Sequence, residues 1–222
     1  MDHETWEGIA REALEATWTD APVDAFSLAG ALDVEVREYD GPEAFVDLFR
    51  RCIYLPRRAM RPERRHGAVA HELGHVLLRD HREDHQNERA ARYLAGALLV
   101  PRESLDRALR RSWSIRVLRS LHPNASHEML ARRVAQVRPA VATVIDGGRV
   151  TARVASPWLA GREVARDVRV WELGLIARAL DEGEVFGDEP TVATHAGGDR
   201  VVCVTRRWWA AGEAPDACAD AA

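Results

Sequence analysis

The sequence predicts an α+β protein, and three observations support this class. Apolar residues recur mainly at helical spacing through residues 1–138, with short strand-like stretches between them. After Pro139 the period changes to two, and alternating runs flank Gly147-Gly148, which is a strong hairpin signal. The length of 222 residues suits one principal domain with a small appendage. We therefore expect a mostly helical core with a small sheet, then a helical segment, then a small C-terminal α+β unit.

These changes in period also predict where the parts begin and end. The core is expected at residues 1–101, because Pro101 ends a helix. A helical segment compatible with a helix-turn-helix follows at 102–138, and the small α+β unit occupies 139–208. The stretch 209–222 has little to bury and is expected to be disordered.

In the core, periodicity and helix breakers set the order of elements. Residues 3–17 form an opening helix, and a second short helix breaks near Asp33 before a strand. "CIYLPRR" predicts another short strand, and Pro56 at its end favours an edge position. Pro62 suits the first turn of a helix that continues to about Arg79, because the N–H that proline lacks is unpaired there anyway.

The remaining elements are shorter. Ser126 is a suitable N-cap for the last helix before the change in period. Gly183 should end a helix in the C-terminal unit, and Gly197-Gly198 predicts a second hairpin. The other helices expected before that unit cover residues 87–99, 102–111, 113–121 and 126–137.

Charge and cysteine content restrict the class of protein. A net charge of −4 and a pI near 6.2 give no general attraction to nucleic acid or to a membrane surface. No apolar run approaches the roughly 20 residues of a membrane helix, and the acidic start resembles no signal peptide. Cys52, Cys203 and Cys218 are odd in number and lack paired spacing, which favours a reducing compartment. A cytoplasmic protein without a membrane partner is expected.

The stretch "AVAHELGHVLLRD" carries the clearest chemical signal. His71 and His75 are four residues apart, so on a helix their rings can point at one metal ion. Two neutral imidazoles supply half of a tetrahedral zinc shell, and Glu72 is placed to take a proton from water on that metal. Gly74 costs about 1 kcal/mol of helix propensity relative to alanine, which is understandable if another backbone packs against it. Buried histidines without partners are costly, so the metal site is favoured over a core helix.

A third protein ligand is needed, and two residues compete for this role. His81 follows His75 by six residues, which is the metzincin spacing, but that pattern needs a glycine where this chain has Leu78. Glu88 opens the next helix and is followed on its face by small residues, which would let that helix lie close to the metal helix. This geometry favours Glu88. Glu88 in a first turn is also favoured by the helix dipole alone.

"HELGHVLL", a polar turn and then "ExxAxxLAxxLLVP" together resemble the ImmA/IrrE family of zinc metallopeptidases, over about residues 5–137. The resemblance implies a zincin-like (gluzincin) core that binds Zn²⁺ through His71, His75 and Glu88, with Glu72 as general base. Members of this family typically cleave or inactivate an XRE-type helix-turn-helix repressor. The resemblance therefore implies an intracellular zinc endopeptidase whose partner is a regulatory protein.

Two positions depart from the family pattern. Four residues after the ligand glutamate the family usually has Asn or Asp, which can accept a hydrogen bond from a ligand histidine; this chain has Arg92, which can only donate. Asp80, Asp84, Asn87 or a main-chain carbonyl must then serve as acceptor. Leu94 replaces an aromatic residue, which is a mild change.

Two other functions stay open at this point. Arg92 favours a metal-binding interaction module with weak or no activity. The arginines within residues 113–137 favour a DNA-binding regulator, although the overall acidic charge argues against direct nucleic-acid binding. Tyr93, His122 and His127 are available as hydrogen-bond donors to a reaction intermediate, but the sequence assigns none of them.

Overall fold

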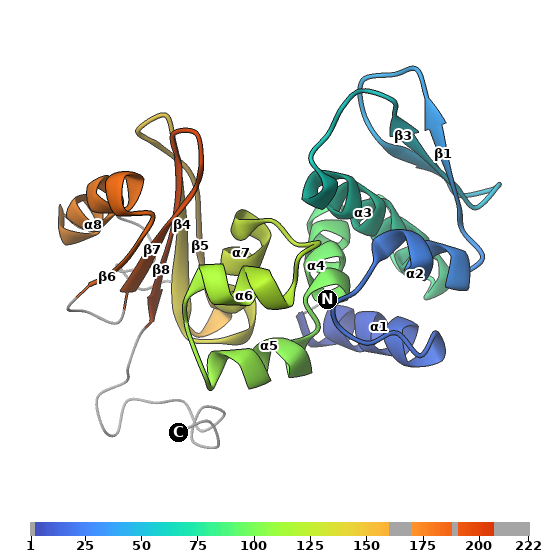
Figure 1. Ribbon diagram of the computed structural model, residues 1–222. Helices are drawn as coiled ribbons and strands as arrows, with labels where there is room; N and C mark the ends of the chain where they lie inside the picture. The colour runs from blue at the N-terminus through green and yellow to red at the C-terminus, as the bar shows by residue number, and fades with distance from the viewer. Residues whose placement is uncertain (1–2, 160–169, 188–190, 207–222) are drawn as a thin grey trace. The chain divides into compact units, whose positions relative to one another are not determined.

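The computed structural model confirms the α+β class, with helices and two small sheets (Figure 1). It describes residues 3–159, 170–187 and 191–206, so the predicted disordered tail at 209–222 lies outside the described residues. Within those ranges, no helix is both long and apolar enough to cross a bilayer.

The chain divides into two compact units that exchange short segments. The first contains Met1–Ser112 and Val117–Leu130, and the second contains Trp113–Arg116 and Ala131–Ala222. The elements of the first unit, with the last two helices shared between the units, are α1 (His3–Ala16), α2 (Ala25–Ala31), β1 (Glu35–Tyr39), β2 (Phe45–Asp47), β3 (Cys52–Pro56), α3 (Pro62–Asp80), α4 (Glu88–Leu99), α5 (Arg102–Leu109), α6 (Ile115–Leu121) and α7 (His127–Val137).

Side-chain caps fix where three of these helices begin. Asp24, Asn87 and Ser126 each accept a hydrogen bond from the backbone N–H three residues later, at 2.8, 3.0 and 3.1 Å. Such a cap is worth about 1 kcal/mol, because it satisfies a donor that the helix leaves unpaired. The predicted role of Ser126 is thus confirmed, and the cap at Asn87 makes Glu88 the first residue of α4.

The three-stranded sheet has the order β1-β3-β2, with β1 parallel and β2 antiparallel to β3. The predicted edge position of the Cys52–Pro56 strand is therefore wrong, because β3 lies in the centre. Pro56 is tolerated because β2 pairs only as far as Tyr54, so no partner on that side needs the missing N–H. The edge strands are β1 and β2, and β2 is a three-residue strand that the sequence did not lead us to expect.

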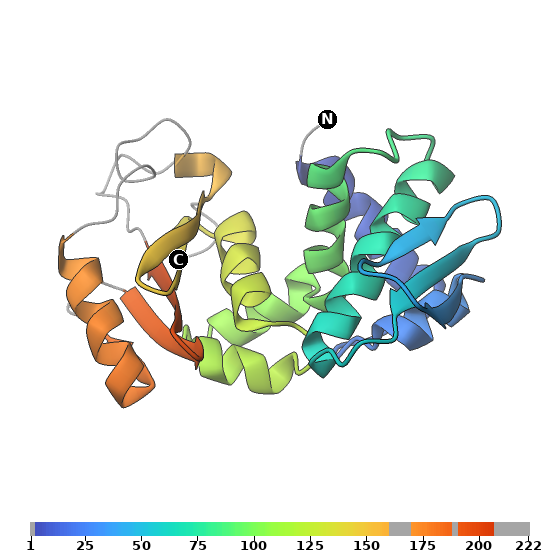
Figure 2. The same cartoon turned by 90° about the horizontal axis from the view of Figure 1, so that it is seen from above.

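Helices α3 and α4 pack against each other closely and lie side by side in both views (Figures 1 and 2). A Cβ atom added at Gly74 would lie 2.8 Å from the carbonyl oxygen of Ala91 and 2.9 Å from its Cα. The expected close approach of another backbone at Gly74 is confirmed. Leu73 and Leu77 are buried on the same helix and belong to the core of this unit.

The second unit is built around an antiparallel sheet of order β5-β4-β8-β7-β6. Both predicted hairpins are present, and Gly147, Gly148, Gly197 and Gly198 have positive φ, as their tight turns require. The elements of the second unit are β4 (Ala140–Asp146), β5 (Arg149–Ala155), the 3₁₀ turn η1 (Pro157–Leu159), α8 (Val170–Glu182), β6 (Glu184–Phe186), β7 (Thr191–Gly197) and β8 (Arg200–Arg206).

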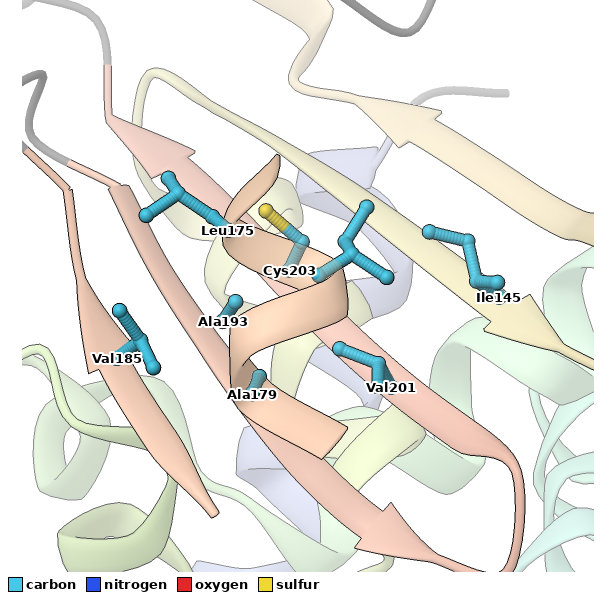
Figure 3. Packing of buried hydrophobic residues seen from close by; sticks show 8 residues of the cluster. Ile145, Leu175, Ala179, Val185, Ala193, Val201 and Cys203 are labelled. Carbon is cyan, nitrogen blue, oxygen red and sulfur yellow. The ribbon is translucent and has the colours of Figure 1, made fainter. Parts of the chain in front are cut away.

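Helix α8 covers one face of this sheet (Figure 3). Leu175 and Ala179 of the helix pack on a buried apolar cluster that includes Val185, Ala193 and Val201 from three strands. This packing explains why the alternating runs of the sequence form a sheet with a helix on it rather than isolated hairpins.

Glu184 ties Trp113–Arg116 to this unit. One carboxylate oxygen accepts a hydrogen bond from the Ser114 hydroxyl at 2.5 Å. The other accepts from the Arg116 N–H at 3.1 Å and from the Thr194 hydroxyl at 2.6 Å. The start of α6 is therefore capped by a residue that lies about seventy positions later in the sequence.

The close approach of α3 and α4 predicts opposite outcomes for two glycines of one helix. Gly74→Ala should lower the free energy of unfolding by about 1–3 kcal/mol, because a backbone atom cannot move aside. Gly67→Ala is the matched control, since its Cβ would meet only the Met129 methyl group, at 3.7 Å. It should be neutral or stabilising by up to about 1 kcal/mol. Urea unfolding of both variants tests this, and equal effects would contradict the close packing.

Candidate metal centre

Helix α3 presents His71 and His75 one turn apart. Their rings meet edge to face, with centroids 4.9 Å apart and an interplanar angle of 89°. The two Nε2 atoms lie 3.3 Å from each other. The predicted convergence of both rings on one point is therefore present, as the four-residue spacing requires.

Glu88 reaches the same point from the first residue of α4. One carboxylate oxygen lies 3.2 Å from Nε2 of His71, and the other lies 3.4 Å from Nε2 of His75. Donor atoms around a tetrahedral zinc ion, with bonds of about 2.0–2.2 Å, are roughly 3.3–3.6 Å apart. Two imidazoles and a carboxylate at these separations fit zinc in donor type and spacing, and they leave one coordination position for water or substrate.

The second ring nitrogen of His75 has a defined partner. Its Nδ1 lies 2.5 Å from the main-chain carbonyl oxygen of His85, to which an Nδ1–H would donate. That hydrogen bond leaves the Nε2 lone pair directed at the metal position. The acceptor is thus the main-chain carbonyl that the sequence left as one option. Within the described part of the chain, His71 has no equivalent acceptor.

Glu72 lies beside this cluster and is only 7% exposed. Burial raises its pKa above the usual range, and the nearby Glu88 carboxylate acts in the same direction. The charge of His75 and a hydrogen bond from the backbone of Val46 oppose this effect. A carboxylate in this setting holds a proton more readily than an exposed one, which suits a group that takes up and gives back protons.

The contact with Val46 shows that β2 runs past Glu72. Neighbouring residues of a strand direct their N–H and C=O groups to opposite sides. An N–H of Val46 that reaches Glu72 therefore points away from β3, to the free edge. The sequence pattern did not indicate this strand, because three residues are too few for a periodic pattern.

The other candidate residues lie elsewhere. His81 follows the end of α3, and its Nε2 is 4.0 Å from Glu12 on α1 rather than in the cluster. The hydroxyl of Tyr93 donates to Glu7 on α1 at 2.8 Å. His122 is buried, with Nε2 3.5 Å from the Ser104 hydroxyl. His127 is the first residue of α7.

Comparison with known families agrees with this geometry. The family described as Peptidase_M78, IrrE N-terminal-like domain, matches residues 29–135. This range contains His71, Glu72, His75 and Glu88. This segment of the chain matches the ImmA/IrrE peptidase family. The resemblance drawn from "HELGH" and the helix that starts at Glu88 is confirmed at the level of the family.

Outside the family match, the comparison gives fold alone. A solved structure, a Mycobacterium tuberculosis transcriptional regulator, is 15% identical and has a TM-score of 0.68. The similarity covers 91% of this chain and 76% of that one, so it extends beyond the segment that carries the family match. A comparison with curated proteins found no match.

Zinc content separates the two candidate third ligands. We expect about one zinc ion per chain in the wild type, and much less in Glu88→Gln, because the amide is a weaker ligand than the carboxylate. His81→Ala is the matched control and should keep the wild-type content. Elemental analysis of the three proteins, purified identically with equal zinc supplied, measures this. Loss of zinc in His81→Ala but not in Glu88→Gln would contradict the assignment.

Proposed function

We propose that this chain is an intracellular zinc-dependent endopeptidase that cleaves a regulatory protein, with an XRE-type helix-turn-helix repressor as the first candidate. The observation that carries the proposal is the convergence of His71, His75 and Glu88 beside the buried Glu72. Membership of a peptidase family supports the reaction class. The solved structure of similar fold is named a transcriptional regulator, which agrees with a regulatory setting.

Each residue has a distinct role in the proposed reaction. His71, His75 and Glu88 hold the metal, which when bound supplies a Lewis acid and lowers the pKa of coordinated water. Glu72 accepts the proton of the attacking water and delivers it to the nitrogen of the leaving amine. The main-chain carbonyl of His85 keeps the His75 ring oriented while the charges change.

The free edge of β2 gives an extended substrate a place to pair. N–H and C=O of one residue point to the same side of a strand, so the Val46 carbonyl faces the edge beside Glu72. A substrate N–H that donates to this carbonyl would lie in the plane of the sheet, as in other cases of strand addition. The scissile bond would then lie next to the general base.

This pairing predicts an effect of methylating the substrate backbone. In a peptide that the enzyme cleaves, N-methylation of the amide opposite Val46 should lower kcat/KM about fivefold, because one hydrogen bond is worth about 1 kcal/mol. A scan of singly N-methylated peptides measures this. Amides on alternate residues, which point away from β2, are the control. A scan without alternation would contradict strand pairing.

The general base predicts a second result. Glu72→Gln should lower cleavage about 10²–10⁴-fold, because the amide cannot accept the proton, while zinc content stays at the wild-type level. Extracts of the source organism are treated with the wild type or with Glu72→Gln, and the new peptide N-termini are labelled and compared. Purified XRE-type repressors are then tested as substrates of both proteins. Equal cleavage by both proteins would contradict the role of Glu72.

One observation supports a second candidate, a metal-binding interaction module without turnover. Arg92 stands where the family usually has an acceptor, and His71 has no acceptor for Nδ1 in the described part of the chain. Under this alternative the wild type binds zinc and a partner protein, yet produces no new N-termini that Glu72→Gln lacks. The same experiment therefore distinguishes the two functions.

A further inference from the structure

Arg92 lies on the same side of α4 as Glu88, one helical turn later, and its side chain is exposed. Residues four apart on a helix have Cβ atoms about 5–6 Å from each other. Glu88 reaches both histidines, so the backbone of Arg92 lies about one helical turn from the residue that contacts them.

The packing of α3 on α4 places Arg92 beside His71. The two helices are joined by a short turn, run antiparallel and meet at Gly74 and Ala91. Ala91 packs on Gly74 and Arg92 is the next residue along α4, so Arg92 lies within about one turn of His71. The charge of Arg92 is accordingly among the influences that lower the pKa of His71, after burial and the charge of His75.

This guanidinium has no carboxylate within 4.0 Å in the described part of the chain, since Glu88 faces the histidines. Arg89 on the same helix differs, because it lies 5.9 Å from the Trp6 ring centroid and 3.4 Å from His3. A divalent cation held by two neutral imidazoles and one carboxylate would have a net charge of +1. The exposed Arg92 side chain adds a second positive charge beside this centre. An anionic group is the complementary ligand.

We propose that Arg92 binds the carboxylate of an acidic residue next to the scissile bond, so that the enzyme prefers peptide bonds flanked by Asp or Glu. This inference rests on the proposed peptidase function and adds a substrate class to it. A guanidinium suits the task because its planar N–H groups match a carboxylate with two parallel hydrogen bonds. Arg92 is one of the two positions at which the sequence departs from the pattern of the family that it resembles.

The test compares cleavage profiles on one peptide library. Zinc-loaded wild type, Arg92→Gln, Arg92→Glu and the control Arg89→Gln, each with its zinc content verified, are incubated with a synthetic library of mixed sequence, and the new N-termini are identified by mass spectrometry. In the wild type and in Arg89→Gln, we expect Asp or Glu to be enriched within two residues of the cut. Arg92→Gln should lose about tenfold in kcat/KM on acidic peptides and little on neutral ones. Arg92→Glu should shift the preference to Lys or Arg.

An unchanged preference in Arg92→Gln would overturn the proposal. If cleavage of all peptides fell equally, Arg92 would act on the charge that develops in the reaction rather than on a substrate side chain, and the assignment to specificity would fail.

A binding measurement separates failure of this inference from failure of the peptidase function. Calorimetry on zinc-loaded Glu72→Gln compares succinyl hydroxamate with butyryl hydroxamate, which carry a carboxylate or a methyl group at the same end. We expect about tenfold tighter binding of the carboxylate form, and no difference in the Glu72→Gln/Arg92→Gln double variant. A wild type that cleaves nothing while this difference persists would refute the peptidase function and leave Arg92 as an anion-binding residue. Equal binding of both probes, with cleavage intact but no acidic preference, would refute the inference alone.

Discussion

The approach of α3 to α4 at Gly74 is the constraint on which the rest of the site depends. A side chain at this position would meet the Ala91 backbone, which has no freedom to move away from its own helix. Only glycine lets Glu88 come within 3.2–3.4 Å of both histidines. A wider spacing would leave three donor atoms that one ion cannot span, because metal–ligand bonds vary by only about 0.2 Å.

The same constraint explains why α4 is rich in small residues. Ala90, Ala91, Ala95 and Ala97 are all buried, and they keep the helix surface smooth where it packs. Leucines at neighbouring positions supply the apolar area that stabilises the pair of helices. Glu88 escapes this packing because it occupies the first turn, where a carboxylate is favoured by the helix dipole and remains accessible. Helix α4 therefore both packs in the core and supplies Glu88 to the candidate metal centre.

The sequence predicted the helices and the cluster better than the strands, and particular residues show why. The caps at Asn87 and Ser126, the turn glycines of the second unit and the four-residue spacing of the histidines are local signals that act within one or two turns of chain. The central position of β3 depends on β2, whose three residues carry no period of their own. Likewise β6 is only three residues long, and Glu184 within it caps α6 from far along the chain. Pairings of this kind are non-local, and no short stretch of sequence encodes them.

The acceptor for His75 helps to explain how Arg92 can occupy its position. A main-chain carbonyl orients the His75 ring, and this group persists whatever side chain follows Glu88. The ring of His71 is held instead by its edge-to-face contact with His75. With both rings positioned in this way, an Asn or Asp at position 92 is not needed to fix either of them, and the position is open to a cation. At position 92 the proposed metal centre therefore lacks an acceptor side chain and has instead a positive charge that a substrate would meet.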